Sequence, residues 1–108
     1  MNKPYIIVFD GDEKSKDSKT FLEIIRSIYV AKIANNCTIL INPIKETTSK
    51  EIYTKIKSKI NFEIFFYVVE FDDFYGDLYT DAWNWLTETF PDISFYKIDE
   101  NDDQLSKM

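Results

Sequence analysis

The residues best placed to do chemistry follow the first apolar segment of the chain. Residues 5–9 read YIIVF, and Asp10, Gly11, Asp12 and Glu13 come directly after them. A buried strand that ends in a carboxylate delivers an oxygen ligand to the edge of a sheet, and divalent cations such as Mg²⁺ prefer oxygen ligands. The same residues also suit a polar turn in which each carboxylate is simply hydrated. Both interpretations stay open at this point.

The residue types that the chain lacks restrict its chemistry. It contains no histidine, and its only arginine is Arg26. Catalysis by a Ser-His-Asp or Cys-His arrangement is therefore excluded within this chain, as is zinc bound by histidine. The single Cys37 lies in the sequence CTILI, whose apolar character favours a buried thiol over a nucleophile. Any catalysis must rest on carboxylates, lysines, tyrosines or a bound metal.

Charge is distributed unevenly along the 108 residues, whose net charge is −6. Residues 1–60 carry eleven Lys/Arg against seven Asp/Glu, and residues 61–108 carry two against twelve. The acidic half repels a polyanion at long range. The best candidates for nucleic-acid binding are four lysines close together in the sequence, Lys50, Lys55, Lys57 and Lys59. The alternative is that these lysines form the solvated face of a helix.

Hydrophobic periodicity predicts the elements that would position these residues. We expect a central strand at 5–9, a helix at 20–30, two strands in VAKIA and CTILINPI joined at Asn35-Asn36, and a strand in FEIFFYVVEF at 62–71. A capping box from Thr48 to Glu51 begins a second helix before the last of these strands. This order predicts an α+β fold of the ferredoxin-like βαββαβ type, an antiparallel sheet with two helices on one face.

The C-terminal part of the sequence predicts a further helix and a short extra strand. The helix runs over about 80–90, begins after Thr80 and ends at Pro91, and ISFYKI at 93–98 alternates like a half-buried strand. We expect one domain over residues 1–98 and an acidic flexible tail over 99–108. No apolar run reaches the roughly 20 residues that span a bilayer, and the first residues do not form a signal peptide, so we expect a cytoplasmic protein.

Three features resemble the superfamily that contains the CRISPR adaptation endonucleases, the VapD-type toxin ribonucleases and the SinR-like proteins. These features are the first strand ending in aspartate (YIIVFD), the ferredoxin-like order, and an apolar strand that continues through EFDDFYGDL into an AWNWL helix. The last feature is most similar to the SinR-like members. The resemblance covers residues 4 to about 90.

The resemblance implies a function for Asp10. It implies that Asp10 is catalytic and that two copies of it, one from each chain of a homodimer, hold Mg²⁺ or Mn²⁺ for cleavage of RNA or DNA. Asp12 is a less favoured metal ligand. Such a metal would lower the pKa of a bound water and stabilise charge on a phosphodiester. The alternative is a non-catalytic, acidic, dimeric interaction or regulatory protein of the same fold, which binds a protein partner or mimics a nucleic acid.

The aromatic strand at 62–71 predicts self-association. Alternation places Ile64, Phe66 and Val68 on one face, and the helices of a ferredoxin-like fold cover only one face. The other face, together with the last strand, supplies the predicted homodimer interface of Phe65, Tyr67, Val69, Phe71 and Phe95. We expect ISFYKI to add a strand at a sheet edge. The alternative is a monomer in which the helix from Trp83 to Phe90 covers this second face.

Overall fold

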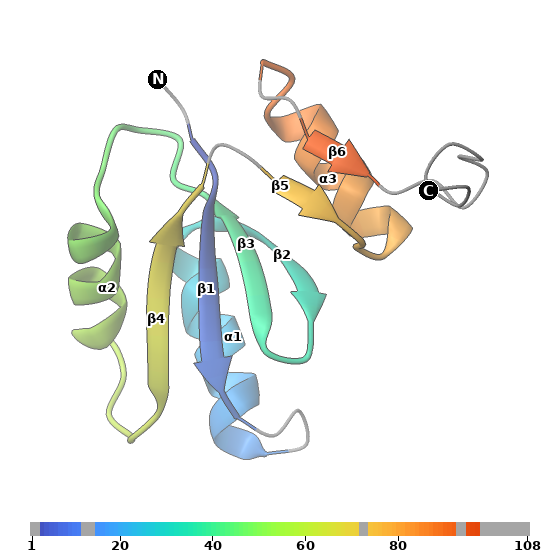
Figure 1. Ribbon diagram of the computed structural model, residues 1–108. Helices are drawn as coiled ribbons and strands as arrows, with labels where there is room; N and C mark the ends of the chain where they lie inside the picture. The colour runs from blue at the N-terminus through green and yellow to red at the C-terminus, as the bar shows by residue number, and fades with distance from the viewer. Residues whose placement is uncertain (1–2, 12–14, 72–73, 93–94, 98–108) are drawn as a thin grey trace.

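Six strands and three helices make up the part of the chain that the computed structural model describes, which is residues 3–11, 15–71, 74–92 and 95–97. Figure 1 shows these elements along the chain. In order they are β1 (Tyr5–Asp10), α1 (Lys16–Ile28), β2 (Val30–Asn35), β3 (Thr38–Asn42), α2 (Ser49–Lys57), β4 (Phe65–Glu70), β5 (Phe74–Gly76), α3 (Thr80–Thr89) and β6 (Phe95–Lys97). The predicted acidic tail at 99–108 lies outside the described residues.

The four longer strands form one antiparallel sheet in the order β2-β3-β1-β4. This arrangement confirms the predicted ferredoxin-like α+β fold. β1 is central, as expected, and β4 is an edge strand. The β1–β4 register places Asp10 opposite Phe65 and Val8 opposite Tyr67.

The main core lies between one face of the sheet and the helices α1 and α2. Alternate residues of β1 point into it, because successive side chains of a strand point to opposite faces. The helices contribute apolar residues at helical spacing, and the buried side chains include Tyr5, Ile7, Phe9, Phe21, Ile25, Ile52, Ile56 and Phe66. Phe21 sits at the centre of an aromatic group, with its ring 5.2 Å from that of Phe9 and 5.1 Å from that of Phe66.

The third helix covers part of the second face of the sheet. Ala82, Leu86 and Phe90 pack with Ala34 of β2 and Leu40 of β3 in a second buried cluster. An ion pair joins Lys32 Nζ of β2 to Asp81 Oδ2 at 2.8 Å and so links the start of α3 to the sheet. The helix therefore folds back over the β2–β3 half of this face, and exposed side chains remain on β4.

Several element boundaries differ from the expectations. α1 begins at Lys16 instead of near residue 20, because the Oγ of Ser15 accepts a hydrogen bond from the Ser18 N–H and caps the helix there. α2 begins as predicted, with Thr48 Oγ1 accepting from the Glu51 N–H at 3.1 Å. α3 begins at Thr80, so the predicted capping by Thr80 is wrong, and Tyr79 occupies the N-cap without a side-chain hydrogen bond.

The extra strand has a different partner from the one expected. β6 pairs in parallel with β5, a strand that the sequence did not predict, in a separate two-stranded sheet. It does not extend the main sheet.

None of the helices in the described parts of the chain has the length and apolar character that a membrane-spanning helix needs.

Candidate functional site

The candidate site is built around Asp10, the last residue of β1. Its side chain is exposed, and alternation places it on the sheet face opposite the main core, together with Ile6 and Val8. The β1–β4 ladder sets Asp10 beside Phe65. The predicted candidate is thus a solvent-accessible carboxylate next to an aromatic ring.

An apolar surface on β4 adjoins this carboxylate. Phe65, Tyr67 and Val69 are 70%, 58% and 42% exposed. The exposure rises steadily toward the Asp10 end of the strand. The opposite end is less exposed because Phe71 and Ile6 pack, half-buried, against the cluster under α3. We call Phe65, Tyr67 and Val69 the β4 patch.

A cavity of about 540 Å³ opens at the Asp10 end of β1 and β4. Asp10 and Lys57 of α2 are the charged side chains that line it, and Tyr53, Phe65 and Tyr67 supply aromatic walls. A carboxylate and an ammonium group that line an aromatic-walled cavity can orient a polar ligand that also carries a planar apolar group.

Gly11 allows the chain to leave β1 close to the first helix. A Cβ atom at this position would collide with Ser18 Oγ and press on the ring of Phe9. Ser18 is buried and accepts a hydrogen bond from Ser15 Oγ at 2.9 Å. The close approach of the chain to Ser18 at Gly11 therefore favours a residue without a Cβ atom.

One chain does not complete a metal site within its described residues. No group of three or more His, Cys, Asp or Glu side chains that could hold a metal occurs in residues 3–11, 15–71, 74–92 and 95–97. Asp12, the second predicted ligand, lies outside the described residues, as does Glu13. Asp10 alone fits Mg²⁺ or Mn²⁺ only where a second carboxylate and water molecules complete the coordination.

The structure separates the four lysines that the sequence grouped as nucleic-acid ligands. Lys57 lines the cavity with Asp10. Lys55 lies over the ring of Tyr29, with its Nζ 5.7 Å from the ring centroid. Lys50 and Lys59 are exposed.

Cys37 and Phe95 lie in surroundings that differ from those expected from the sequence. Cys37 is exposed, so the predicted buried thiol is wrong. Its backbone N–H donates to Asn35 Oδ1 at 2.9 Å in the turn between β2 and β3, which turns the thiol away from the core. Phe95 of the predicted interface lies in β6, outside the main sheet.

Sequence reasoning missed Tyr53 as a candidate site residue. Tyr53 is partly exposed, and its ring stacks on that of Phe66 at 4.7 Å with an interplanar angle of 25°. The sequence did contain a signal for it, because Lys50, Tyr53 and Lys57 lie at i, i+3 and i+7, a spacing that places side chains on one side of a helix.

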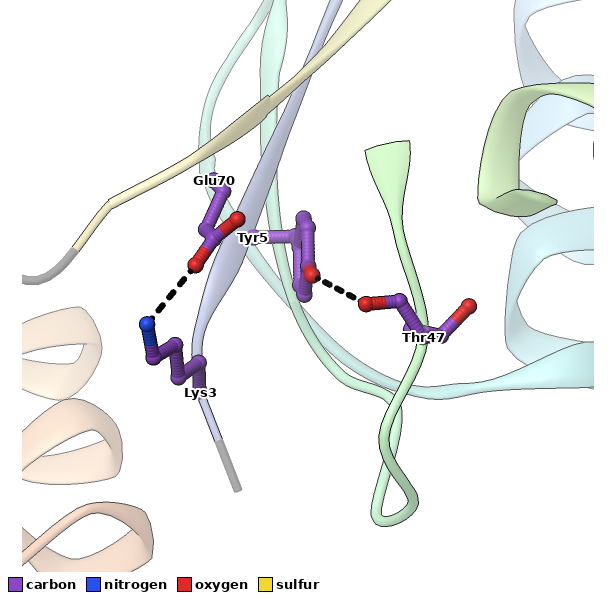
Figure 2. A network of polar contacts seen from close by, with 4 residues as sticks. All are labelled: Lys3, Tyr5, Thr47 and Glu70. Atoms are coloured by element: carbon purple, nitrogen blue, oxygen red, sulfur yellow. Dashed lines mark hydrogen bonds and ion pairs between the residues drawn. The ribbon is translucent and has the colours of Figure 1, made fainter. Parts of the chain in front are cut away.

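A second group of polar contacts lies at the other end of β1 (Figure 2). Lys3 Nζ pairs with Glu70 Oε1 at 3.0 Å, and the Tyr5 hydroxyl donates to the Thr47 carbonyl oxygen at 2.8 Å. Burial raises the pKa of Tyr5, and the negative charge of Glu70 raises it further. These contacts join β1 to β4 and to the loop before α2, which gives them a structural role.

No family model, curated protein or solved structure matches the chain.

Proposed function

We propose that the chain forms a symmetric homodimer through the β4 patch and acts as a metal-dependent endonuclease, with RNA as the favoured substrate. The observation that carries this proposal is the position of Asp10 beside Phe65, the most exposed residue of the patch. A two-fold axis near Phe65 would bring two Asp10 carboxylates together. The resemblance to the CRISPR adaptation endonuclease, VapD and SinR-like superfamily supports the same arrangement.

Energetics favour a partner over this patch. Burying a fully exposed large apolar side chain stabilises by roughly 1.5–3 kcal/mol. The three side chains of the patch, which are 42–70% exposed, forgo part of this stabilisation in the single chain. A two-fold interface is the commonest way for soluble chains to assemble, and it uses the same patch on both copies. The exposure gradient along β4 supports an interface centred near Asp10 and away from α3.

The paired carboxylates would give the dimer its chemistry. Two facing carboxylates repel each other unless a cation or a shared proton lies between them. Mg²⁺ or Mn²⁺, held by both Asp10 side chains and by water, would supply an activated water and stabilise negative charge on a phosphodiester. The Asp10 residues would hold the ion, and burial of the surrounding patch would exclude bulk water and strengthen the electrostatic interactions.

The charge of the chain favours a second candidate function. The net charge of −6 opposes approach of a polyanion, and the described residues of one chain provide no cluster of three metal ligands. A homodimer without activity, which binds a protein partner or acts as a regulatory mimic of nucleic acid, would use the same patch.

Cleavage assays separate the two functions. Labelled single-stranded RNA, single-stranded DNA and duplex DNA are incubated with Mg²⁺ or Mn²⁺, with and without a chelator. The nuclease proposal expects metal-dependent cleavage that Asp10→Ala and Asp10→Asn abolish while the protein stays folded. Glu23→Gln, which removes an exposed acid on α1, is the matched control and should keep activity. Cleavage that survives Asp10→Ala contradicts the assignment, and no cleavage of any substrate favours the second function.

A further inference from the structure

A stripe of three side chains on α2 runs toward the Asp10 cavity. Lys50, Tyr53 and Lys57 lie at i, i+3 and i+7, so they share one side of the helix. They extend over about 10 Å along its axis. All three are exposed, Tyr53 by 38%. Tyr53 and Lys57 also line the cavity that contains Asp10. We call Lys50, Tyr53 and Lys57 the α2 stripe.

The ring of Tyr53 is held in place by the sheet. It stacks on Phe66, which is itself buried in the main core against Phe21. A ring supported in this way loses little conformational entropy when a second planar group stacks on it. Tyr53 therefore offers a preorganised aromatic surface between two ammonium groups. Figure 1 shows α2 alongside β4, the edge strand.

Neither lysine of the stripe forms an ion pair within the described part of the chain. The ion pairs among the described residues join Lys3 to Glu70 and Lys32 to Asp81. Glu51, the acid within α2, accepts a hydrogen bond from Thr47 Oγ1 at 3.0 Å. The stripe is therefore a local cationic surface on an acidic protein.

We propose that the α2 stripe binds a single-stranded polynucleotide. Lys50 and Lys57 would contact phosphate groups, and Tyr53 would stack on a base, which is how proteins bind single strands without reading their sequence. The strand would then lead into the cavity at Asp10. The proposal rests on the proposed function for the step at Asp10, although binding itself does not require cleavage. Phe65 and Tyr67 of the β4 patch line the same cavity as Tyr53 and Lys57, so the strand would run along the edge of the proposed dimer interface.

Binding is best measured in Asp10→Ala protein, because this variant cannot cleave the probe. Fluorescence anisotropy with labelled 12-mers of oligo(U) and oligo(dT), without metal and at several salt concentrations, gives the affinity and its salt dependence. The Lys57→Ala substitution, added to the Asp10→Ala protein, should weaken binding several-fold. It should also lower the slope of log affinity against log salt concentration by about 0.7 in magnitude. Added Tyr53→Leu should weaken binding about tenfold, whereas Tyr53→Phe should keep it.

Lys55→Ala is the matched control. It removes the same charge from the same helix, but Lys55 lies over Tyr29 and not on the stripe. Its effect on affinity should be clearly smaller than that of Lys57→Ala. Circular dichroism checks that each variant is folded, and Tyr53→Phe and Lys57→Ala keep the test valid if Tyr53→Leu unfolds.

Three results would overturn the proposal. The first is that neither oligonucleotide binds. The second is that Lys55→Ala and Lys57→Ala lower the affinity equally. The third is that Lys57→Ala and Tyr53→Leu both leave the affinity unchanged. Binding of one oligonucleotide only shows whether the stripe accepts the RNA or the DNA probe and supports the proposal. Metal-dependent cleavage by the wild-type chain is measured separately, so loss of the stripe does not count against Asp10.

Discussion

Asp10 and Phe65 face each other across the β1–β4 ladder, with the carboxylate at the rim of an exposed apolar surface. Any partner that covers Phe65 must also approach Asp10. Assembly and the chemistry of the carboxylate are therefore physically linked, because removal of water around a carboxylate strengthens its interaction with a cation. This link makes the association of the chain the first property to test.

Phe65→Lys should convert the proposed homodimer to a monomer. Each copy would lose an apolar contact worth roughly 1.5–3 kcal/mol and place a charge in the interface, so the dissociation constant should rise about a hundredfold or more. Light scattering coupled to size exclusion at micromolar concentration measures the mass. Tyr79→Lys changes an equally exposed aromatic residue at the start of α3 and should leave the dimer intact. A wild-type mass near 12.8 kDa would contradict the dimer and the shared Asp10 site.

Tyr5→Phe should lower the free energy of unfolding by about 1 kcal/mol, because the Thr47 carbonyl group loses its hydrogen-bond donor. Urea denaturation at pH 7 measures this loss. Tyr79→Phe, at an exposed position, serves as the control and should have no effect. A Tyr5→Phe variant as stable as the wild type would show that the hydrogen bond adds nothing to stability.

The pKa of Tyr5 also predicts how stability changes in alkaline solution. Burial and the charge of Glu70 raise this pKa, so the folded chain keeps its proton where the unfolded chain, with a tyrosine pKa of about 10, releases it. Stability is therefore constant with respect to this group below about pH 10 and falls above it. The stability of the Tyr5→Phe variant should fall less steeply with rising pH than that of the wild type. The slope that remains comes from Tyr29, whose pKa burial also raises.

The fold was largely predictable because local and periodic patterns agree with each other. Each element has its own local signal: the apolar segments at 5–9 and 62–71, the Asn35-Asn36 turn, and the capping box at Thr48. The ferredoxin-like order follows from these signals. The start of α1 was missed because Ser15 caps it from an otherwise polar segment without apolar periodicity. The β5–β6 pair was missed because a parallel pair depends on contacts distant in sequence.

The candidate site was only partly predictable. Asp10 and the exposed face of β4 follow from alternation along two strands. The cavity does not, since it depends on how α2 packs against β4 and brings Tyr53 and Lys57 toward Asp10. Cys37 was misjudged because its apolar neighbours belong to β3, whereas Cys37 itself lies in the preceding turn.

Ile44→Gly should stabilise the chain, by up to about 1 kcal/mol. Ile44 is exposed and has φ of 72°, a conformation that a β-branched residue adopts only with strain and that glycine adopts freely. Thermal denaturation measures the gain. Lys45→Gly, at the next exposed position, is the control and should be neutral or destabilising because its φ is not positive. A loss of stability in Ile44→Gly would show that packing of the isoleucine outweighs the backbone strain.

Asp81→Asn should loosen the attachment of α3 to the sheet. The hydrogen bond from Lys32 lowers the pKa of Asp81, so the ion pair stabilises the fold above the unfolded pKa of about 3.9, and this contribution disappears as the pH falls through the folded pKa. The effect should be small, because Asp81 is largely exposed, and it should vanish at high salt. A double-mutant cycle with Lys32→Met at pH 7, in low and high salt, isolates the coupling. Hydrogen exchange of the α3 amides then reports whether the helix opens more often. No coupling at low salt would mean that the apolar cluster of Ala82, Leu86 and Phe90 alone holds α3 over its half of the sheet.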